Sequence, residues 1–178
     1  MRIIAGRWRG HPLRAPAGRK TRPTPDRVRE AWMSALLPWI PDARVVDLFS
    51  GSGALGLEML SRGAAHVTFV EKARSALDAI DANVAKLGAG GEVDVVRGDA
   101  VAFVRRLEAG AFEIAVADPP YHQGLSQALV ERFAEVRFAE WLWIEHASDE
   151  KLPELPGART RRYGDTSITA IPATVEDP

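Results

Sequence analysis

The chain contains no cysteine among its 178 residues, and only four histidines. The missing thiols exclude disulfide bonds and thiolate metal centres and agree with a reducing, cytoplasmic location. The histidines are scattered without the spacing of metal ligands, so we expect no metal site. No apolar run is long enough to cross a bilayer, and we therefore expect no membrane partner.

Internal repeats and low-complexity tracts are also missing, and the composition is that of a globular enzyme. Hydrophobic residues make up 46% of the chain and charged residues 26%, which is enough apolar material for a substantial core. We expect a small extension over residues 1–40 and a single larger domain over residues 41–178.

The formal net charge is only −1, but the charges are unevenly distributed. Residues 1–30 carry nine basic and two acidic side chains, so the remainder of the chain is strongly acidic. A basic segment on an acidic protein is typical of a nucleic-acid contact, although a solvated tail without a ligand has the same composition. Glycines and prolines interrupt the segment, which excludes the amphipathic helix of a transit peptide.

The basic extension has a regular pattern of its own. Residues 2–6 and 11–14 are typical of two short strands around a turn, and Thr24-Pro25-Asp26 is a start signal for a helix that ends before Pro38. Arginines off the apolar stripe of that helix, and arginines of the hairpin, can contact RNA. The candidate RNA-binding residues are Arg7, Arg9, Arg22, Arg27 and Arg29.

Alternating strand and helix signals over the rest of the chain predict an α/β fold. The expected strands cover residues 44–49, 67–71, 93–97, 113–117, 141–146, 158–163 and 167–172. The expected helices cover residues 53–62, 72–87, 100–109 and 125–135. The last two strands have no helix between them, so the sequence predicts a seven-stranded, doubly wound sheet, mostly parallel with an antiparallel edge strand.

A glycine loop follows the first of these strands. Gly51, Gly53 and Gly56 spell G-x-G-x-x-G, and Glu71 follows Gly51 by 20 residues, as in a dinucleotide-binding fingerprint. Here, however, the strand ends in an acid, Asp47, and three further residues precede the glycines. An acid at this place repels a phosphate and suits a cationic ligand. S-adenosylmethionine, which carries an ammonium and a sulfonium, fits this loop better than a nicotinamide or flavin dinucleotide.

A second motif, Asp118-Pro119-Pro120-Tyr121, follows the apolar strand 113–117. A rigid turn needs neither the acid nor the aromatic ring, but methylation of an amine can use both. Asp118 and the Pro119 carbonyl can accept hydrogen bonds from an exocyclic NH₂, and Tyr121 can stack on the base. The motif stands 71 residues after Asp47, with the expected acids between, and this spacing favours methyl transfer over a simple turn.

From Ala43 onward the chain resembles the class I S-adenosylmethionine-dependent methyltransferases. The resemblance implies that Asp47 and the glycine loop hold the methionine part of the cofactor, that Glu71 binds the ribose hydroxyls and that Asp99 faces the adenine. The cofactor-binding positions implied in this way are Asp47, Phe49, Ser50, Gly51, Gly53, Glu71, Lys72, Asp99 and Ala100. The catalytic positions are Asp118, Pro119, Pro120 and Tyr121.

Two N-terminal stretches narrow the resemblance. Arg2-Ile3-Ile4-Ala5-Gly6-Arg7-Trp8-Arg9-Gly10 and Arg22-Pro23-Thr24-Pro25-Asp26-Arg27-Val28-Arg29-Glu30 are similar to the bacterial 16S rRNA guanine-2-amino methyltransferases, the RsmD-like enzymes. The resemblance implies an enzyme that methylates 16S rRNA, in the small ribosomal subunit or an assembly intermediate, and releases S-adenosylhomocysteine. The oligomeric state does not follow from the sequence, and we expect a monomer. The second motif is shared with adenine amino-methyltransferases of DNA or RNA, which remain an alternative. A noncatalytic RNA-binding protein that keeps the cofactor fold is another.

Overall fold

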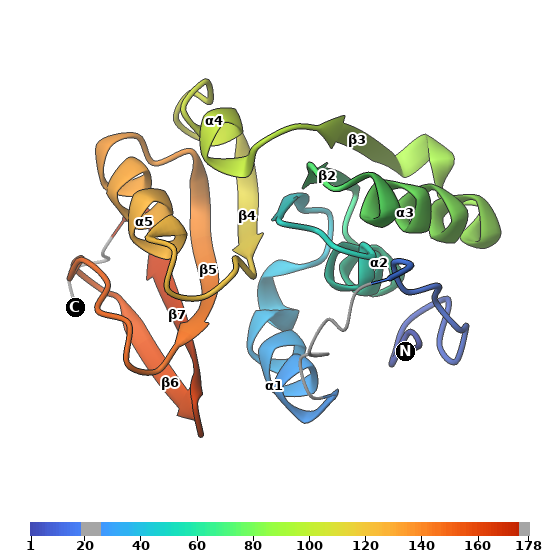
Figure 1. Cartoon of the computed structure of the whole chain (residues 1–178), viewed down its shortest axis with the longest axis horizontal. Helices are drawn as coiled ribbons and strands as arrows, with labels where there is room; N and C mark the ends of the chain where they lie inside the picture. The colour runs from blue at the N-terminus through green and yellow to red at the C-terminus, as the bar shows by residue number, and fades with distance from the viewer. Residues whose placement is uncertain (19–25, 175–178) are drawn as a thin grey trace.

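The computed structural model describes residues 1–18 and 26–174, and it centres on one seven-stranded sheet with the order β3-β2-β1-β4-β5-β7-β6 (Figure 1). The strands are β1 (Arg44–Leu48), β2 (His66–Glu71), β3 (Val93–Arg97), β4 (Phe112–Ala117), β5 (Ala139–Ala147), β6 (Arg159–Tyr163) and β7 (Thr166–Pro172). The first five strands pair in parallel, and β7 runs antiparallel to both β5 and β6. The predicted sheet, mostly parallel with an antiparallel edge, is confirmed.

Helices cover both faces of this sheet. The helices are α1 (Asp26–Leu36), α2 (Ala54–Ser61), α3 (Arg74–Leu87), α4 (Ala100–Val104) and α5 (Leu125–Glu135), with short 3-10 turns η1 (Leu37–Trp39) and η2 (Gly90–Glu92). Helices α1, α2 and α3 lie on one side and α4 and α5 on the other (Figure 1). Successive strand residues therefore point into two separate cores. Val45, Phe69 and Ile114 join the first core, and Val46, Val70 and Ala115 join the second.

Helix α4 is shorter than the sequence predicted, because the expected helix over residues 100–109 ends at Val104. The guanidinium of Arg132, on α5, donates hydrogen bonds to the carbonyl oxygens of Val104 (3.2 Å), Arg105 (3.0 Å) and Leu107 (3.2 Å). These carbonyls are satisfied without a further helical turn. The apolar pattern of the segment did not show this contact, since Arg132 lies well over twenty residues further along the chain.

The N-terminal residues form the expected hairpin, with an antiparallel bridge between Arg2 and Pro12. The N–H of Ile3 donates to the His11 carbonyl (3.0 Å), and the N–H of Leu13 donates to the Met1 carbonyl (3.0 Å). Ile3 and Leu13 are buried in the first core together with α1. The basic extension and the sheet therefore share one core.

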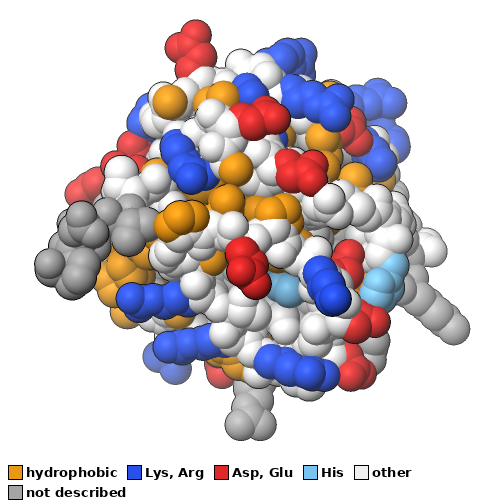
Figure 2. All heavy atoms as spheres, turned by 90° about the vertical axis from the view of Figure 1, so that its left-hand side faces the viewer, with side chains coloured by type: hydrophobic (Ala, Val, Ile, Leu, Met, Phe, Trp, Pro, Cys, Tyr) orange, Lys and Arg blue, Asp and Glu red, His pale blue; other side chains and the backbone are white. Residues whose placement is uncertain are grey.

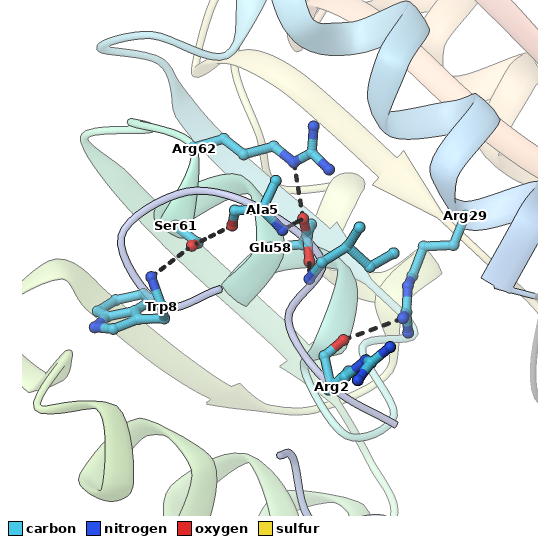
Figure 3. Close-up of polar contacts among 8 residues, drawn as sticks. Arg2, Ala5, Trp8, Arg29, Glu58, Ser61 and Arg62 are labelled. Atoms are coloured by element: carbon cyan, nitrogen blue, oxygen red, sulfur yellow. Dashed lines mark hydrogen bonds and ion pairs between the residues drawn. The ribbon is translucent and has the colours of Figure 1, made fainter. Parts of the chain in front are cut away.

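Polar side chains of α2 hold the first strand of the hairpin, residues 2–6, in place (Figure 3). The carboxylate of Glu58, which is 1% exposed, accepts the N–H groups of Ile4 (2.7 Å) and Ala5 (3.0 Å). The Ser61 hydroxyl donates to the Ala5 carbonyl (2.6 Å) and accepts the N–H of Trp8 (3.0 Å). Gly6 lies so close to α2 that a Cβ atom there would stand 1.8 Å from the Ser61 carbonyl oxygen, so no larger residue fits.

A buried asparagine on α3 joins the other strand of the hairpin to the glycine loop. The Asn83 side-chain oxygen accepts the N–H of Arg14 (2.7 Å), and its amide nitrogen donates to the carbonyls of Arg14 and Ser52 (3.0 Å each). Asn83 is 1% exposed, so these three bonds satisfy most of its hydrogen-bonding capacity without water.

Figure 2 shows the side of the molecule that carries α5 and the antiparallel edge, where basic and acidic side chains surround a small apolar patch. Strand β6 is exposed over Arg159, Thr160, Arg161 and Arg162. Among the described helices, none combines the length and apolar character that a membrane span requires. Within the same residues, no three histidine or acidic side chains gather into a group that could hold a metal ion.

Candidate active site

The two sequence motifs meet where the strand order reverses. Strand β1 pairs with β2 on one side and with β4 on the other, and this is the point at which open α/β sheets bind ligands, beyond the carboxyl ends of the strands. Leu48 pairs with Ala117, so Asp47 and Asp118 stand at the same end of neighbouring strands. The structure thus brings the predicted cofactor loop and the predicted catalytic motif to one edge of the sheet.

Asp47 is almost fully buried, with 2% of its surface exposed. One carboxylate oxygen accepts the N–H of Gly56 at 3.0 Å. Burial raises the pKa of Asp47 to about 7; the Gly56 hydrogen bond opposes this rise, and the charge of Glu71 adds to it. A cationic group beside Asp47 would stabilise its ionised form, so the site is suited to a positively charged ligand near neutral pH.

The residues after β1 form a tight loop held by Ser50. Its hydroxyl donates to the Asp47 carbonyl (2.5 Å) and accepts the N–H of Val70 (3.0 Å), so this predicted cofactor residue ties the loop to β2 from inside the protein. Phe49 has a positive φ of 61° and packs on the second core. Gly51 has a φ of 56°, and no heavy atom lies within 4 Å of the place where its Cβ would stand. Its backbone is open to a ligand.

The carboxylate of Glu71 fixes the other side of the loop. One oxygen accepts the N–H of Gly51 at 2.9 Å, and the other accepts the N–H groups of Lys72 and Ala73 at 2.8 Å each. Glu71 is 7% exposed. Each carboxylate oxygen has two lone pairs, so the oxygen that meets Gly51 keeps one for a hydroxyl donor such as a ribose.

Asp99 continues this row of acids after the next strand, β3. Its side chain caps α4 by accepting the N–H of Ala102 at 2.9 Å, while the Lys72 amine lies 3.9 Å from its second oxygen. Lys72 and Asp99 are both exposed, with side-chain exposures of 66% and 45%, whereas Ala100 is buried in the second core. Gly53, with a φ of 76°, is the N-cap residue of α2. The predicted cofactor residues therefore line the ends of three successive strands.

The four residues of the second motif alternate in exposure. Asp118 and Pro120 are exposed, Pro119 is buried and Tyr121 is half-buried. The Tyr121 hydroxyl donates to the carboxylate of Glu145 at 2.7 Å, and it lies 3.1 Å from the Thr166 hydroxyl. Burial, with Glu145 nearby, raises the pKa of Tyr121 well above its usual range, so the phenol stays neutral. Sequence analysis did not single out Glu145 or Thr166.

The predicted RNA-binding arginines have different environments. Arg9 is exposed on the hairpin, and Arg7 donates to both carboxylate oxygens of Glu92 (2.7 Å) while it covers the Trp8 ring at 4.0 Å. Arg29 is only 6% exposed and donates to the Arg2 carbonyl at 3.2 Å (Figure 3), so it links α1 to the hairpin. Arg22 lies outside the described residues, and of Arg27 only the backbone, in α1, is described.

Comparisons with known proteins agree with this geometry. A family model described as Conserved hypothetical protein 95 matches residues 1–171. Ribosomal RNA small subunit methyltransferase D of Escherichia coli is 38% identical over 159 residues, which is 88% of this chain and 79% of the relative. The protein of the same name from Haemophilus influenzae is 32% identical, over 85% of this chain and 81% of its own length.

This chain belongs to the RsmD family. Membership confirms the resemblance seen in the N-terminal stretches and the two motifs. The solved structure of yhhF from Escherichia coli has a TM-score of 0.82 and 34% identity, and it covers 96% of both chains. Protein TTHA0928 from Thermus thermophilus has a TM-score of 0.81 and 31% identity, covering 97% of this chain and 99% of that one. The fold of this RsmD-family protein is that of the class I methyltransferases.

Proposed function

We propose that this protein transfers a methyl group from S-adenosylmethionine to the exocyclic 2-amino group of a guanine in 16S rRNA. The observation that carries the proposal is the meeting of a buried acid and an exposed acid, Asp47 and Asp118, at the ends of adjacent strands. The first suits a cationic cofactor, and the second is exposed to solvent, from which a substrate amine would approach. The names of the Escherichia coli and Haemophilus influenzae relatives support small-subunit rRNA as the substrate.

The residues at the cofactor edge fit S-adenosylmethionine. The open backbone of Gly51 and the carboxylate of Asp47 would hold its methionine part, Glu71 would accept its ribose hydroxyls, and the exposed Asp99 would face its adenine. When bound, the cofactor supplies the methyl group and leaves as S-adenosylhomocysteine. This ligand carries no phosphate, and its ammonium and sulfonium groups are cations that the buried Asp47 would attract.

The second motif would position the guanine. Asp118 and the Pro119 carbonyl would each accept a hydrogen bond from one N–H group of the amine. The lone pair of the nitrogen would then face the methyl group. The nitrogen loses one proton after attack, and the solvent-exposed Asp118 can pass it to water. Well-oriented reactants gain up to about 7 to 11 kcal/mol, so such positioning supplies much of the acceleration. A stacked base cannot reach the site, and extruding it against Tyr121 costs a few kcal/mol.

The extension over residues 1–40 would bind the rRNA, while residues 41–178 form the methyltransferase domain. Arg9 is exposed and lines a cavity of about 300 Å³ between the hairpin and α1, where it joins Arg2, Arg29 and one acid, Glu30. A concave, arginine-lined surface is suited to a phosphate of the RNA backbone. We assign Arg7 and Arg9 to RNA contact and Arg29 to support, and the roles of Arg22 and Arg27 stay predictions. The substrate would be the small subunit or an assembly intermediate in the cytoplasm, bound by a monomer.

The deciding experiment incubates the protein with methyl-labelled S-adenosylmethionine and small subunits or 16S rRNA lacking the modification, then identifies the labelled nucleoside. Label in 2-methylguanosine that is lost in Asp118→Ala supports the proposal. Label in a methyladenosine would instead show an adenine methyltransferase, and binding without transfer would show a noncatalytic protein. Arg9→Ala should weaken RNA binding and reduce its salt dependence by about one counterion. Arg74→Ala, on the surface of α3, is the matched control.

A further inference from the structure

We infer that Glu145 is a positioning residue of the methyltransferase, which holds the Tyr121 ring in the orientation that receives the target base. The inference rests on the proposed function and extends it to a residue outside both sequence motifs. It also assigns a role to the antiparallel edge of the sheet, since β7 supplies the second contact to the same hydroxyl.

The contacts come from three segments far apart in the sequence. Tyr121 follows β4, Glu145 lies near the end of β5 and Thr166 begins β7. The Tyr121 hydroxyl is 2.7 Å from a carboxylate oxygen of Glu145 and 3.1 Å from the Thr166 hydroxyl. Strands β5 and β7 are hydrogen-bonded neighbours, in which Ala147 pairs with Thr166. The two anchors are therefore fixed relative to each other by the sheet.

Burial makes the Glu145 contact strong. Glu145 is 3% exposed, so water competes little for its carboxylate, and a hydrogen bond to an ionised group in such surroundings is stronger than one between neutral groups. The raised pKa of the phenol agrees with a hydroxyl that keeps its proton as a donor. A phenol held in this way acts through the place of its ring and not as a proton donor to the substrate.

The backbone on the other side of the ring is equally constrained. Pro119 and Pro120 fix two φ angles directly before Tyr121, and the next residue, His122, has a φ of 59° and donates its N–H to Glu150 at 2.9 Å. The ring thus has a stiff backbone at one end and two hydrogen-bond partners on strands at the other, an acceptor in Glu145 and a donor in Thr166. Without the hydroxyl contacts, the Tyr121 ring can still rotate about its side-chain bonds. Such rotation would misplace a base stacked on the ring.

The test is a double-mutant cycle on methyl transfer to RNA, with Tyr121→Phe, Glu145→Gln and the combined variant. Each single change should lower kcat/KM for RNA by about tenfold, because Tyr121→Phe removes the hydrogen bond and Glu145→Gln replaces its carboxylate acceptor with a weaker amide acceptor. The affinity for S-adenosylmethionine should be unchanged. In the Tyr121→Phe protein, Glu145→Gln should have no further effect, because the hydroxyl through which it acts is gone. Glu140→Gln, an exposed position on the same strand, is the matched control and should behave as the wild type.

The inference would be overturned if the two substitutions lowered kcat/KM independently, so that their effects multiplied in the double variant. It would also be overturned if the substitutions lowered the affinity for S-adenosylmethionine to the same extent, since Glu145 would then serve only the fold. Thermal unfolding of each variant separates misfolding from misplacement, and Glu145→Gln retains an acceptor oxygen, so it tests the idea even if Glu145→Ala does not fold. Failure of the wild-type protein to methylate RNA would count against the proposed function. A working wild type with an additive cycle would count against the role of Glu145 alone.

Discussion

Asp47 and Asp118 end neighbouring parallel strands, yet their surroundings are opposite. Asp47 is 2% exposed and accepts a backbone N–H, and Glu71 on the next strand is held by three more. Asp118 lies open to solvent between alanine and proline. The half of the site that we propose for the cofactor is built from buried acids that shape loops, whereas the half that we propose for the substrate carries an exposed acid. The difference shows that the same residue type is buried in the loop framework on one strand and exposed to solvent on its neighbour in the sheet.

The largest effect should come from Asp118→Ala, which removes the exposed acid of the second motif. We expect methyl transfer to fall about 10²- to 10³-fold, as when one oriented hydrogen-bonding group is lost from an active site. Cofactor affinity should stay within about twofold. Single-turnover transfer and calorimetric binding measure the two quantities. A large loss of cofactor binding would erase the distinction between the two halves.

Gly56→Ala should have the next largest effect, which is a loss of folding stability in the half of the site that contains Asp47 and Glu71. A Cβ at Gly56 would lie 2.5 Å from the Phe69 ring and 2.8 Å from a methyl group of Val67. Overpacking of this kind costs about 1 to 3 kcal/mol of unfolding free energy, which chemical denaturation measures. Gly90→Ala is the control, because no heavy atom lies within 4 Å of the added carbon. Equal stability of the two variants would show that α2 does not depend on close approach to the sheet.

The pKa of Asp47 predicts a pH dependence of the cofactor half. If the ionised form binds the cationic cofactor, a pKa of about 7 makes the Kd about tenfold lower at pH 8 than at pH 6, and Asp47→Asn removes the dependence. Since this pKa lies above the unfolded value of 3.8, the Asp47 contribution to stability falls as pH rises from about 4 to 7. Binding and unfolding titrations measure both slopes. A pH-independent Kd would contradict the electrostatic role of Asp47.

The smallest effect should follow Lys72→Ala. The Lys72 amine stands 3.9 Å from Asp99, and both side chains are largely exposed, so their ion pair is screened by water. We expect cofactor affinity to change by less than about threefold and the unfolding temperature to remain near that of the wild type. A larger loss of binding would mean that an exposed side chain also belongs to the framework that Asp47 and Glu71 provide.

Local patterns in the sequence predicted most of the framework. Strand positions, the glycine loop and the Asp118 motif follow from apolar runs, glycines and prolines within a few residues of one another. Contacts over long separations were not predictable in this way. Periodicity does not show that Arg132 ends α4, that Glu145 meets Tyr121 or that Arg29 is buried under the hairpin, because each depends on where distant segments meet in space.

The count of charged residues in the N-terminal extension also could not predict which arginines are exposed. It correctly indicated a basic hairpin, but it treated all arginines alike, and the structure separates the exposed Arg9 from the buried Arg29. A buried arginine needs a hydrogen-bond acceptor, and for Arg29 this acceptor is the carbonyl of Arg2. Composition does not show that such an acceptor is near. The division of labour among basic residues is therefore a tertiary property.

The three hydrogen bonds of Asn83 have a consequence for the order of assembly. Residues 1–18 precede their buried polar partners in the chain, because Glu58 and Asn83 lie on α2 and α3 and leave the ribosome later. The hairpin reaches its final place only when the glycine loop and both helices have been made. The surface that we propose for ribosomal RNA is therefore completed only together with the loop that we propose for the cofactor, so a partly synthesised chain that lacks α3 would not bind rRNA through a finished hairpin.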